Sequence, residues 1–283
     1  MTLESTTKIG LYLGLLLAIG AVSAYWWVLR RTRVDSDAPW RIDVESRLRV
    51  IGLCASSIAA TALAARAWAH TASVFGFGDS WSLHALRAIV VESRWGHGWR
   101  WQLVGALGCL VLFGAAAGSS RSVWAAVACA VVAFAWTVTM TGHASGAAGR
   151  MTLHAAHLIA AGLWLGTLAS LMAIGQISDA TRRRLLFSAF AVVALAGAAT
   201  AVATGAAASY LYVGTFANVA ATPYGRVLTL KVAFVAVATA CGYVNWRSIR
   251  AGSAEPGRAA RIELLAALSI VVVTSLLTEL EHP

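Results

Sequence analysis

The sequence predicts an all-α membrane protein that crosses a bilayer about eight times, and three observations lead to this fold class. Hydrophobic residues make up 59% of the 283 positions and charged residues only 12%, whereas soluble domains carry about a quarter charged residues. Apolar runs close to the ~20 residues that a helix needs to cross a bilayer recur along the whole length. These runs are too long and too weakly alternating for barrel strands, which leaves a bundle of helices.

Eight apolar segments account for the predicted membrane helices. In chain order they cover residues 9–28, 48–69, 101–118, 123–140, 152–174, 185–208, 226–246 and 262–279. No connection between them has the length of a soluble domain, so residues 1–283 are predicted to form a single integral membrane domain. Within it, residues 1–120 hold the first three helices with a long outer loop at 70–100, and residues 123–283 hold the last five.

The first segment is predicted to be a retained helix, although "AVSA" within it resembles a signal-peptide cleavage site. The basic residues Arg30, Arg31 and Arg33 follow the segment, whereas Lys8 is the only basic residue before it. A signal peptide carries its positive charge on the leading side. The observed distribution therefore favours a helix that starts outside and stays in the membrane.

Two later regions carry further signals of a membrane bundle. The loop 70–100 is predicted to hold a short interfacial helix, and its tryptophans suit an aromatic belt at the membrane–water boundary. These tryptophans are Trp81, Trp95, Trp99 and Trp101. The Gly- and Ala-rich stretch "ALAGAATAVATGAAAS" of the sixth segment is typical of close helix packing, with no chemistry implied.

The charges in the connections predict the orientation. One alternating set of connections, 29–47, 119–122, 175–184 and 247–261, holds most of the basic residues. With Arg49, just inside the second helix, they account for fourteen of the 22 Lys and Arg: Arg30, Arg31, Arg33, Arg41, Arg47, Arg49, Arg121, Arg182, Arg183, Arg184, Arg247, Arg250, Arg258 and Arg261. Positively charged loops face the cytoplasm, so both termini are predicted to lie outside. This pattern explains the net charge of +10 without a nucleic-acid partner.

All seven histidines fall on the predicted outer side or its approach. They are His70, His84, His97, His143, His154, His157 and His282. The four cysteines, by contrast, are solitary and lie inside apolar runs, with no CxxC pair that would suggest zinc or thiol redox chemistry. A metal site is therefore expected on the outer side.

The stretch "TGHASGAAGRMTLHAAHLIAAGLWLGTL" concentrates metal-binding residue types. Met151, His154 and His157 are spaced three apart, so each step turns a helix by ~300° and rises by ~4.5 Å, which keeps them along one stripe. The turn before this helix is short enough for His143 to fold back over its top. Met140 ends the preceding helix and completes a predicted cluster of imidazole and thioether donors.

These donor types favour copper. Thioether sulfur is a soft ligand that selects Cu(I), and imidazole binds copper in both oxidation states. Magnesium and calcium prefer carboxylates, which the stretch lacks, and zinc gains little from methionine. The alternative is that the histidines are interfacial side chains bonded to water or backbone, and that Met151 is a packing residue. A polar side chain inside the membrane is costly enough to keep a functional role in view.

This stretch and the C-terminal part of the chain resemble the copper resistance protein D family. The resemblance rests on "TGHASG" followed by "HLIAAGLWLGTL", on "TPYGRVLTLKVAFVAVATACGYVNWRS" and on "RIELLAALSIVVVTSLL". It spans roughly residues 140–280, and the first half of the chain is matched only by hydropathy and length. The positions that match recurring residues of the family are Tyr224, Gly225, Arg226, Lys231, Asn245 and Glu263.

The resemblance implies copper handling in the bacterial inner membrane, with periplasmic termini. Members of the family are thought to move copper toward the cytoplasm, often beside a periplasmic copper chaperone of the CopC type. Such a chaperone and membrane lipid are therefore the expected partners. By position, His143 and His157 are the family-matched candidates for copper contact, whereas His154 is supported by geometry. The chain lacks a long Met-rich outer segment and a fused chaperone domain, which favours one or two sites.

Other polar residues are secondary candidates. One group of polar residues has two interpretations, an entry or secondary site on the outer side, or plain surface and tail positions. The group consists of His70, His84, His97, Glu279, Glu281 and His282. Lys231 is a candidate gating residue, and the alternative is a side chain that snorkels to the outer surface. Glu263 is a candidate release ligand on the inner side, and the alternative is a favourable charge at a helix N-terminus.

Two other functional classes stay open. A b-type haem protein needs axial ligands on facing helices, which His143 and His157 would supply but two histidines on one helix would not. A scaffold without metal is the third possibility, opposed only by the histidine bias. No nucleophile–base pair, phosphate loop or intramembrane carboxylate pair is recognisable, so an enzyme is not expected. The predicted ligand is copper, as Cu(I) or Cu(II), with haem as the alternative.

Overall fold

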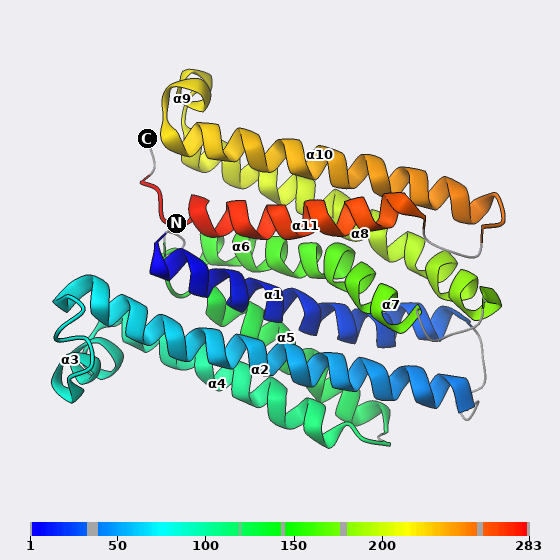
Figure 1. Cartoon of the computed structure of the whole chain (residues 1–283), viewed down its shortest axis with the longest axis horizontal. Helices are drawn as coiled ribbons and strands as arrows, with labels where there is room; N and C mark the ends of the chain where they lie inside the picture. The colour runs from blue at the N-terminus through cyan, green and yellow to red at the C-terminus, as the bar shows by residue number, and fades with distance from the viewer. Residues whose placement is uncertain are drawn as a thin grey trace.

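The computed structural model describes residues 2–32, 39–118, 120–142, 145–175, 180–253 and 257–281, and within these ranges the chain is helical with no strand. The long helices lie side by side along the long axis of the molecule (Figure 1). The predicted all-α bundle is therefore confirmed.

Eight long segments of the described chain run up and down this bundle. They are α1 (Leu3–Ser23) continued by η1 (Ala24–Val28) and η2 (Leu29–Thr32), α2 (Pro39–Phe75), α4 (Arg94–Ala115), α5 (Arg121–Val138), α6 (Ala148–Ala161) continued by η4 (Gly162–Gly166) and α7 (Thr167–Gly175), α8 (Ala180–Val213), α10 (Pro223–Arg250) and α11 (Arg258–Leu277). The short helices α3 (Leu83–Arg87), η3 (Ala88–Glu92) and α9 (Phe216–Ala221) lie at the end of the bundle where both termini lie (Figure 1).

Seven of these eight segments are long and apolar enough to cross a membrane. The exception is α4, which corresponds to the predicted helix 101–118 but begins with the polar turns "RWGHGWRW". α4 packs against both α2 and α5, so tertiary contacts hold it in the bundle. The prediction of a polytopic membrane protein is confirmed, with one helix whose own composition is less apolar than the others.

Several helices extend past their predicted ends. The second predicted helix, 48–69, is the centre of α2, which has 37 residues, and the sixth, 185–208, is the centre of α8, which has 34. The turn added at the start of α8, "ATRRR", consists mostly of Ala and Arg, which are good helix formers, so this helix begins before the apolar run does. At 1.5 Å per residue, α2 is about 55 Å long and exceeds the ~30 Å hydrocarbon layer.

The outer connection differs from the single interfacial helix expected there. It folds into two five-residue turns, α3 and η3, before Ser93 caps α4 by accepting from the backbone N–H of Gly96. Its tryptophans have different surroundings: Trp81 is 72% exposed, whereas Trp99 is 8% exposed and donates to the Leu63 carbonyl at 2.9 Å. Trp99 is therefore a core residue, which the belt interpretation did not anticipate.

The centre of the bundle is a close contact between α1 and the wide helical turn η4. α1 packs against α2, α5, α6, η4, α7 and α11. Gly20 of α1 and Gly166 of η4 approach backbone to backbone, and a Cβ on either one would collide with the main chain of the other helix. Only glycine allows such an approach, because any side chain would push the helices apart.

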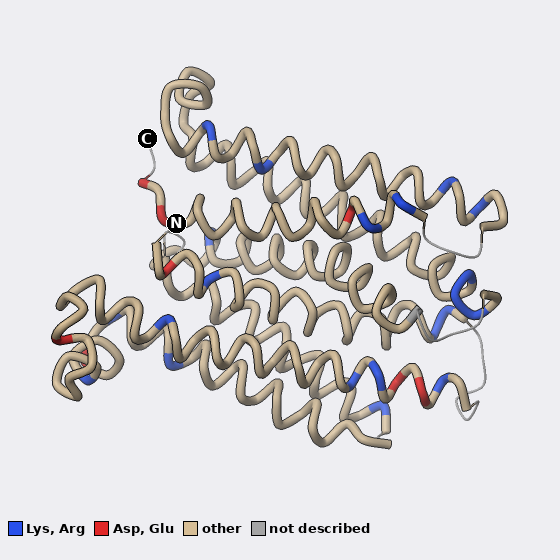
Figure 2. Tube along the Cα trace, viewed as in Figure 1, with Lys and Arg blue, Asp and Glu red and all other residues tan. Residues whose placement is uncertain are grey.

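Charge is distributed unevenly along the bundle. Lys and Arg gather at the end opposite the termini, as Figure 2 shows. There the i,i+4 pairs Arg41–Glu45 and Arg47–Asp43 join side chains of α2 at 3.0 and 2.8 Å. At the other end, Lys8 of α1 forms an ion pair with Glu279, just after α11, and so links the two ends of the chain.

The α1–η4 contact yields a stability prediction. Gly166→Ala is expected to destabilise the protein by about 1–3 kcal/mol, because its Cβ must displace the Leu16 carbonyl of α1. The measurement is the thermal unfolding midpoint in detergent. Gly108→Ala on α4 is the matched control, since its Cβ meets nothing within 4 Å. A Gly166→Ala protein as stable as this control would contradict the contact.

Candidate functional site

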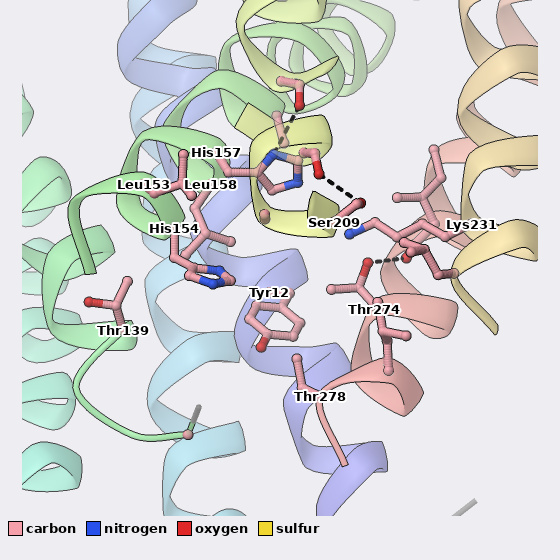
Figure 3. A pocket seen from close by; sticks show the side chains of 18 of the residues that line it. Tyr12, Thr139, Leu153, His154, His157, Leu158, Ser209, Lys231, Thr274 and Thr278 are labelled. Atoms are coloured by element: carbon pink, nitrogen blue, oxygen red, sulfur yellow. Dashed lines mark hydrogen bonds between the residues drawn. The ribbon is translucent and has the colours of Figure 1, made fainter. Parts of the chain in front are cut away.

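A cavity of about 380 Å³ lies in the half of the bundle that holds the termini. Its walls come from α1, α2, α6, η4, α8, α10 and α11, together with the connection after α5. Figure 3 shows His157, Lys231 and Tyr12 entering this region from three different helices. The cavity therefore forms only when segments distant in the sequence come together.

Two histidines of α6, His154 and His157, line this cavity. His154 lies toward its edge, where its Nε2 is 2.9 Å from the hydroxyl oxygen of Tyr212 on α8. The two rings are 5.5 Å apart between centroids. This contact joins α6 to α8 and orients the imidazole of His154.

The backbone of α8 fixes the tautomer of His157. Its Nδ1 lies 3.0 Å from the carbonyl oxygen of Ala201 and 3.0 Å from the hydroxyl oxygen of Thr204. A carbonyl only accepts, so Nδ1 carries the proton, and Thr204 directs its own proton to the Thr200 carbonyl at 2.6 Å. In the neutral ring Nε2 therefore keeps its lone pair, and it has no hydrogen-bond partner among the described residues. Metal-ligating histidines are typically held in this way.

A glycine makes room for this ring. A Cβ at Gly205 of α8 would meet Cε1 of His157 at 3.2 Å, closer than ordinary packing. The Gly- and Ala-rich stretch of α8 thus positions an imidazole as well as packing helices, a role that the sequence interpretation did not assign.

Three basic side chains line the same cavity: Lys8 of α1, Arg66 of α2 and Lys231 of α10. Lys8 is paired with Glu279 and also lies 3.2 Å from the hydroxyl oxygen of Thr278. Within the described chain, no acidic residue lines the cavity. The cavity is therefore electropositive, with the imidazoles of His154 and His157 on one wall.

A buried carboxylate lies behind the cavity wall. Trp164 of η4 lines the cavity, and its Nε1 donates to Oε1 of Glu263 on α11 at 3.0 Å. Asn245 of α10 donates to Oε2 at 2.9 Å. Glu263 is 2% exposed, the only buried acidic residue in the described ranges, and no basic side chain there pairs with it. Two positions of the resemblance, Asn245 and Glu263, are thus in direct contact.

The other proposed ligands are placed differently. Met140 and Met151 do not line the cavity, and His143 lies outside the described residues. The described part of the chain contains no group of three or more His, Cys, Asp or Glu side chains that could hold a metal ion. His154 and His157 are the candidate ligands that the structure brings into one cavity.

None of the described candidates for an entry site lines the cavity. Those outside its lining are His70, His84, His97, Glu279 and Glu281, and His282 lies outside the described residues. His70 contacts Glu4 at 2.7 Å and stacks on Trp95 with centroids 4.1 Å apart. His97 accepts from Trp101 at 3.3 Å, while His84 and Glu281 are exposed. These residues remain candidates for a secondary role.

The structure adds residues that the sequence interpretation missed. Tyr12, Arg66 and Tyr212 line the cavity, and Thr204 helps to hold His157. The sequence could have indicated Arg66, because an arginine inside a predicted membrane helix by itself suggests a functional role. Nothing in the sequence pattern singled out Thr204 or Tyr212, whose roles depend on how α8 packs against α6.

Trp164 generates a second prediction. Trp164→Phe is expected to destabilise the protein by about 1–3 kcal/mol, because it leaves Oε1 of buried Glu263 without its donor. Thermal unfolding of the purified protein measures this loss. Trp136→Phe on α5 is the control, since Trp136 is 37% exposed. Equal midpoints for the two variants would contradict the importance of this hydrogen bond.

Comparison with protein families gives two matches. A model described as Copper resistance protein D-like, N-terminal domain, matches residues 5–153, and a model described as Copper resistance protein D matches residues 184–278. The first match extends the resemblance into the half of the chain that hydropathy alone had matched. A search of curated proteins and of solved structures found no match. Because the first model covers more than half of the residues and the second most of the remainder, the chain belongs to the copper resistance protein D family.

Proposed function

We propose that the protein binds copper in the cavity of the outer half and moves it from the periplasm toward the cytoplasm across the bacterial inner membrane. The observation that carries this proposal is His157, whose Nδ1 is committed to α8 and whose Nε2 keeps a lone pair in a cavity-lining ring. Family membership supports copper as the substrate. The protein would act as a binding and transport protein rather than as an enzyme.

The charges around the cavity favour Cu(I) over Cu(II). Coulomb repulsion from Arg66 and Lys231 doubles when the charge of the metal ion doubles. No carboxylate in the described lining offsets this repulsion. Neutral imidazole and thioether ligands suit the soft, singly charged ion. We therefore propose that copper enters this cavity as Cu(I).

The proposed ligands are His157 and His154, with His143 as the third. His143 is the residue after Gly142, which lines the cavity, and this position in the sequence supports its inclusion. We propose Met140 and Met151 as outer capture residues that hand copper on to the histidines. His70, His84, His97, Glu279, Glu281 and His282 would form the approach on the periplasmic side.

The inward route would pass Trp164 and Glu263. Trp164 lines the cavity on one side and donates to Glu263 on the other, so it is the element between the outer site and the buried carboxylate. Glu263 would hold the cation briefly after it leaves the imidazoles. We propose that Lys231, which lines the cavity, acts as a gate by electrostatic repulsion. A periplasmic chaperone of the CopC type would supply the metal, and membrane lipid surrounds the bundle.

Haem is the second candidate, and the same observation favours it. A neutral imidazole with a free Nε2, in a cavity with basic side chains, fits one axial position of haem and its acidic propionates. The second axial ligand would be His143, because His154 lies on the same helix as His157. When bound, haem would supply electron transfer, and His157 would orient the iron.

The main prediction concerns metal content. Purified wild-type protein loaded with Cu(I) is expected to retain near-stoichiometric copper, and His157→Ala is expected to lose about tenfold or more in affinity, because a ligand is removed. His154→Ala is expected to weaken binding as well. Metal analysis with an optical spectrum measures both. His84→Ala is the control, since His84 is exposed and distant from the cavity lining.

The optical spectrum separates the two candidates. Copper without a Soret band supports the copper proposal, and a Soret band lost in His157→Ala would replace it with haem. Copper retained equally by wild type, His157→Ala and His84→Ala would overturn the role of the cavity. No bound metal in any of them, and no Soret band, would overturn both candidates.

Orientation provides a further prediction. In a background with the four native cysteines replaced by Ala, Glu281→Cys is expected to react with a membrane-impermeant maleimide added to spheroplasts. Ser253→Cys, in the exposed connection after α10, is expected to react only after lysis. The reason is the excess of Lys and Arg at the end that holds Ser253. Reaction of Ser253→Cys in intact spheroplasts would show that this end faces the periplasm. The orientation and the transport direction would then be opposite to those proposed.

A further inference from the structure

Arg66 is a buried charge without an acidic partner. Arg66 belongs to α2 and is 4% exposed. Its Nη1 donates to Oε1 of Gln102 at 3.3 Å and to Oγ1 of Thr141 at 3.2 Å. Both acceptors are neutral. Among the described residues its Nε has no hydrogen-bond partner, and Trp95 adds a cation–π contact at 5.5 Å. A buried guanidinium left in this state is costly unless a negative group arrives to pair with it.

The nearby carboxylates are already engaged elsewhere. Glu4 contacts His70 at 2.7 Å and accepts from Ser73 at 2.9 Å, and Glu279 is paired with Lys8. Within the described chain neither of them forms an ion pair with Arg66, and neither lines the cavity. Arg66 therefore contributes net positive charge to the cavity wall.

The remainder of the cavity is mainly apolar and reaches the flank of the bundle. Its walls include Leu158, Leu228 and Ile270. Val202 of α8 and Val232 of α10 also line it, although they are 50% and 57% exposed. Side chains that line a cavity while remaining exposed on a membrane-facing surface mark its open side. An apolar chain in the bilayer thus has a lateral route between α8 and α10.

From these features we propose that the cavity binds an amphiphile with an anionic oxygen head, a carboxylate or a phosphate, placed at Arg66. Its apolar body lies along Tyr12, Leu158 and Leu228 toward the opening between α8 and α10. The head receives charge-assisted hydrogen bonds from the guanidinium, the strongest class of such bonds. This site shares the cavity of the proposed copper site, but its ligand is recognised by Arg66 and by apolar walls, so it goes beyond the proposed copper function.

A free anion is the other source of the same head group. It would satisfy Arg66 but leave the apolar walls without a ligand. An amphiphile uses both parts of the cavity, which is why the observations favour it.

The test uses the full-length protein in dodecyl maltoside with a chelator, so that its result does not depend on copper. The thermal unfolding midpoint is followed while oleate, oleyl alcohol or inorganic phosphate is added. Oleate is expected to raise the midpoint, and oleyl alcohol is expected to bind about tenfold or more weakly, because it lacks the charge. Inorganic phosphate at the same concentration is expected to have little effect.

Two variants locate the head group. Arg66→Gln is expected to bind oleate about tenfold or more weakly than wild type, with oleyl alcohol unaffected. Arg87→Gln is the control, because the Arg87 side chain is 70% exposed and pairs with Glu92 outside the cavity. Equal binding of oleate by wild type and Arg66→Gln would overturn the proposal. So would equal binding of oleate and oleyl alcohol by wild type, a comparison that holds even if Arg66→Gln does not fold.

The phosphate arm separates the two sources. Inorganic phosphate could raise the midpoint as far as oleate does, with the rise abolished in Arg66→Gln. In that case the ligand is a free anion, and the proposal of an amphiphile is wrong. If none of the three compounds changed the midpoint, the amphiphile proposal would fail but the copper result would stand. The copper experiment depends on His157 and on metal content instead.

Discussion

The close contact between α1 and η4 is the constraint on which the rest of the structure depends. Gly20 and Gly166 bring the two main chains together at a distance that no side chain permits. The wide turn of η4 sets the direction of Trp164, which lines the cavity and donates to Glu263. Widened turns of this kind are frequent at functional sites. One backbone approach therefore positions the cavity and the buried carboxylate relative to each other.

The cavity combines a partly buried imidazole with positive charges, and burying either of these alone is unfavourable in free energy. The backbone of α8 holds the ring of His157 through its Nδ1, while Arg66 and Lys231 bring positive charge to the same space. These charges oppose a bound cation in part, and an anion alone would leave the imidazole unused. Copper bound as Cu(I) and an acidic amphiphile would offset each other's charge. The two proposals are thus independent in their tests but compatible in their electrostatics.

Neither half of the chain contains this cavity. The two family models divide the sequence into 5–153 and 184–278, yet α1 and α2 supply one side of the cavity and α8, α10 and α11 supply the other. The segment from α6 to α7 crosses between them and carries both histidines. The ion pair of Lys8 with Glu279 closes the same assembly at the termini. Residues of both family regions therefore build the cavity together.

The sequence by itself determined the helical class, the approximate position of each long helix and the spacing of His154 and His157, because these follow from hydropathy, helix length and local spacing. It did not determine the partners of those residues. Tyr212 and Arg66 line the cavity, and Thr204 contacts His157, only because α8 and α2 pack beside α6 and α1. The pairing of Asn245 with Glu263 needs α10 against α11. Such contacts are set by glycine-mediated packing between distant segments, and no local pattern encodes them.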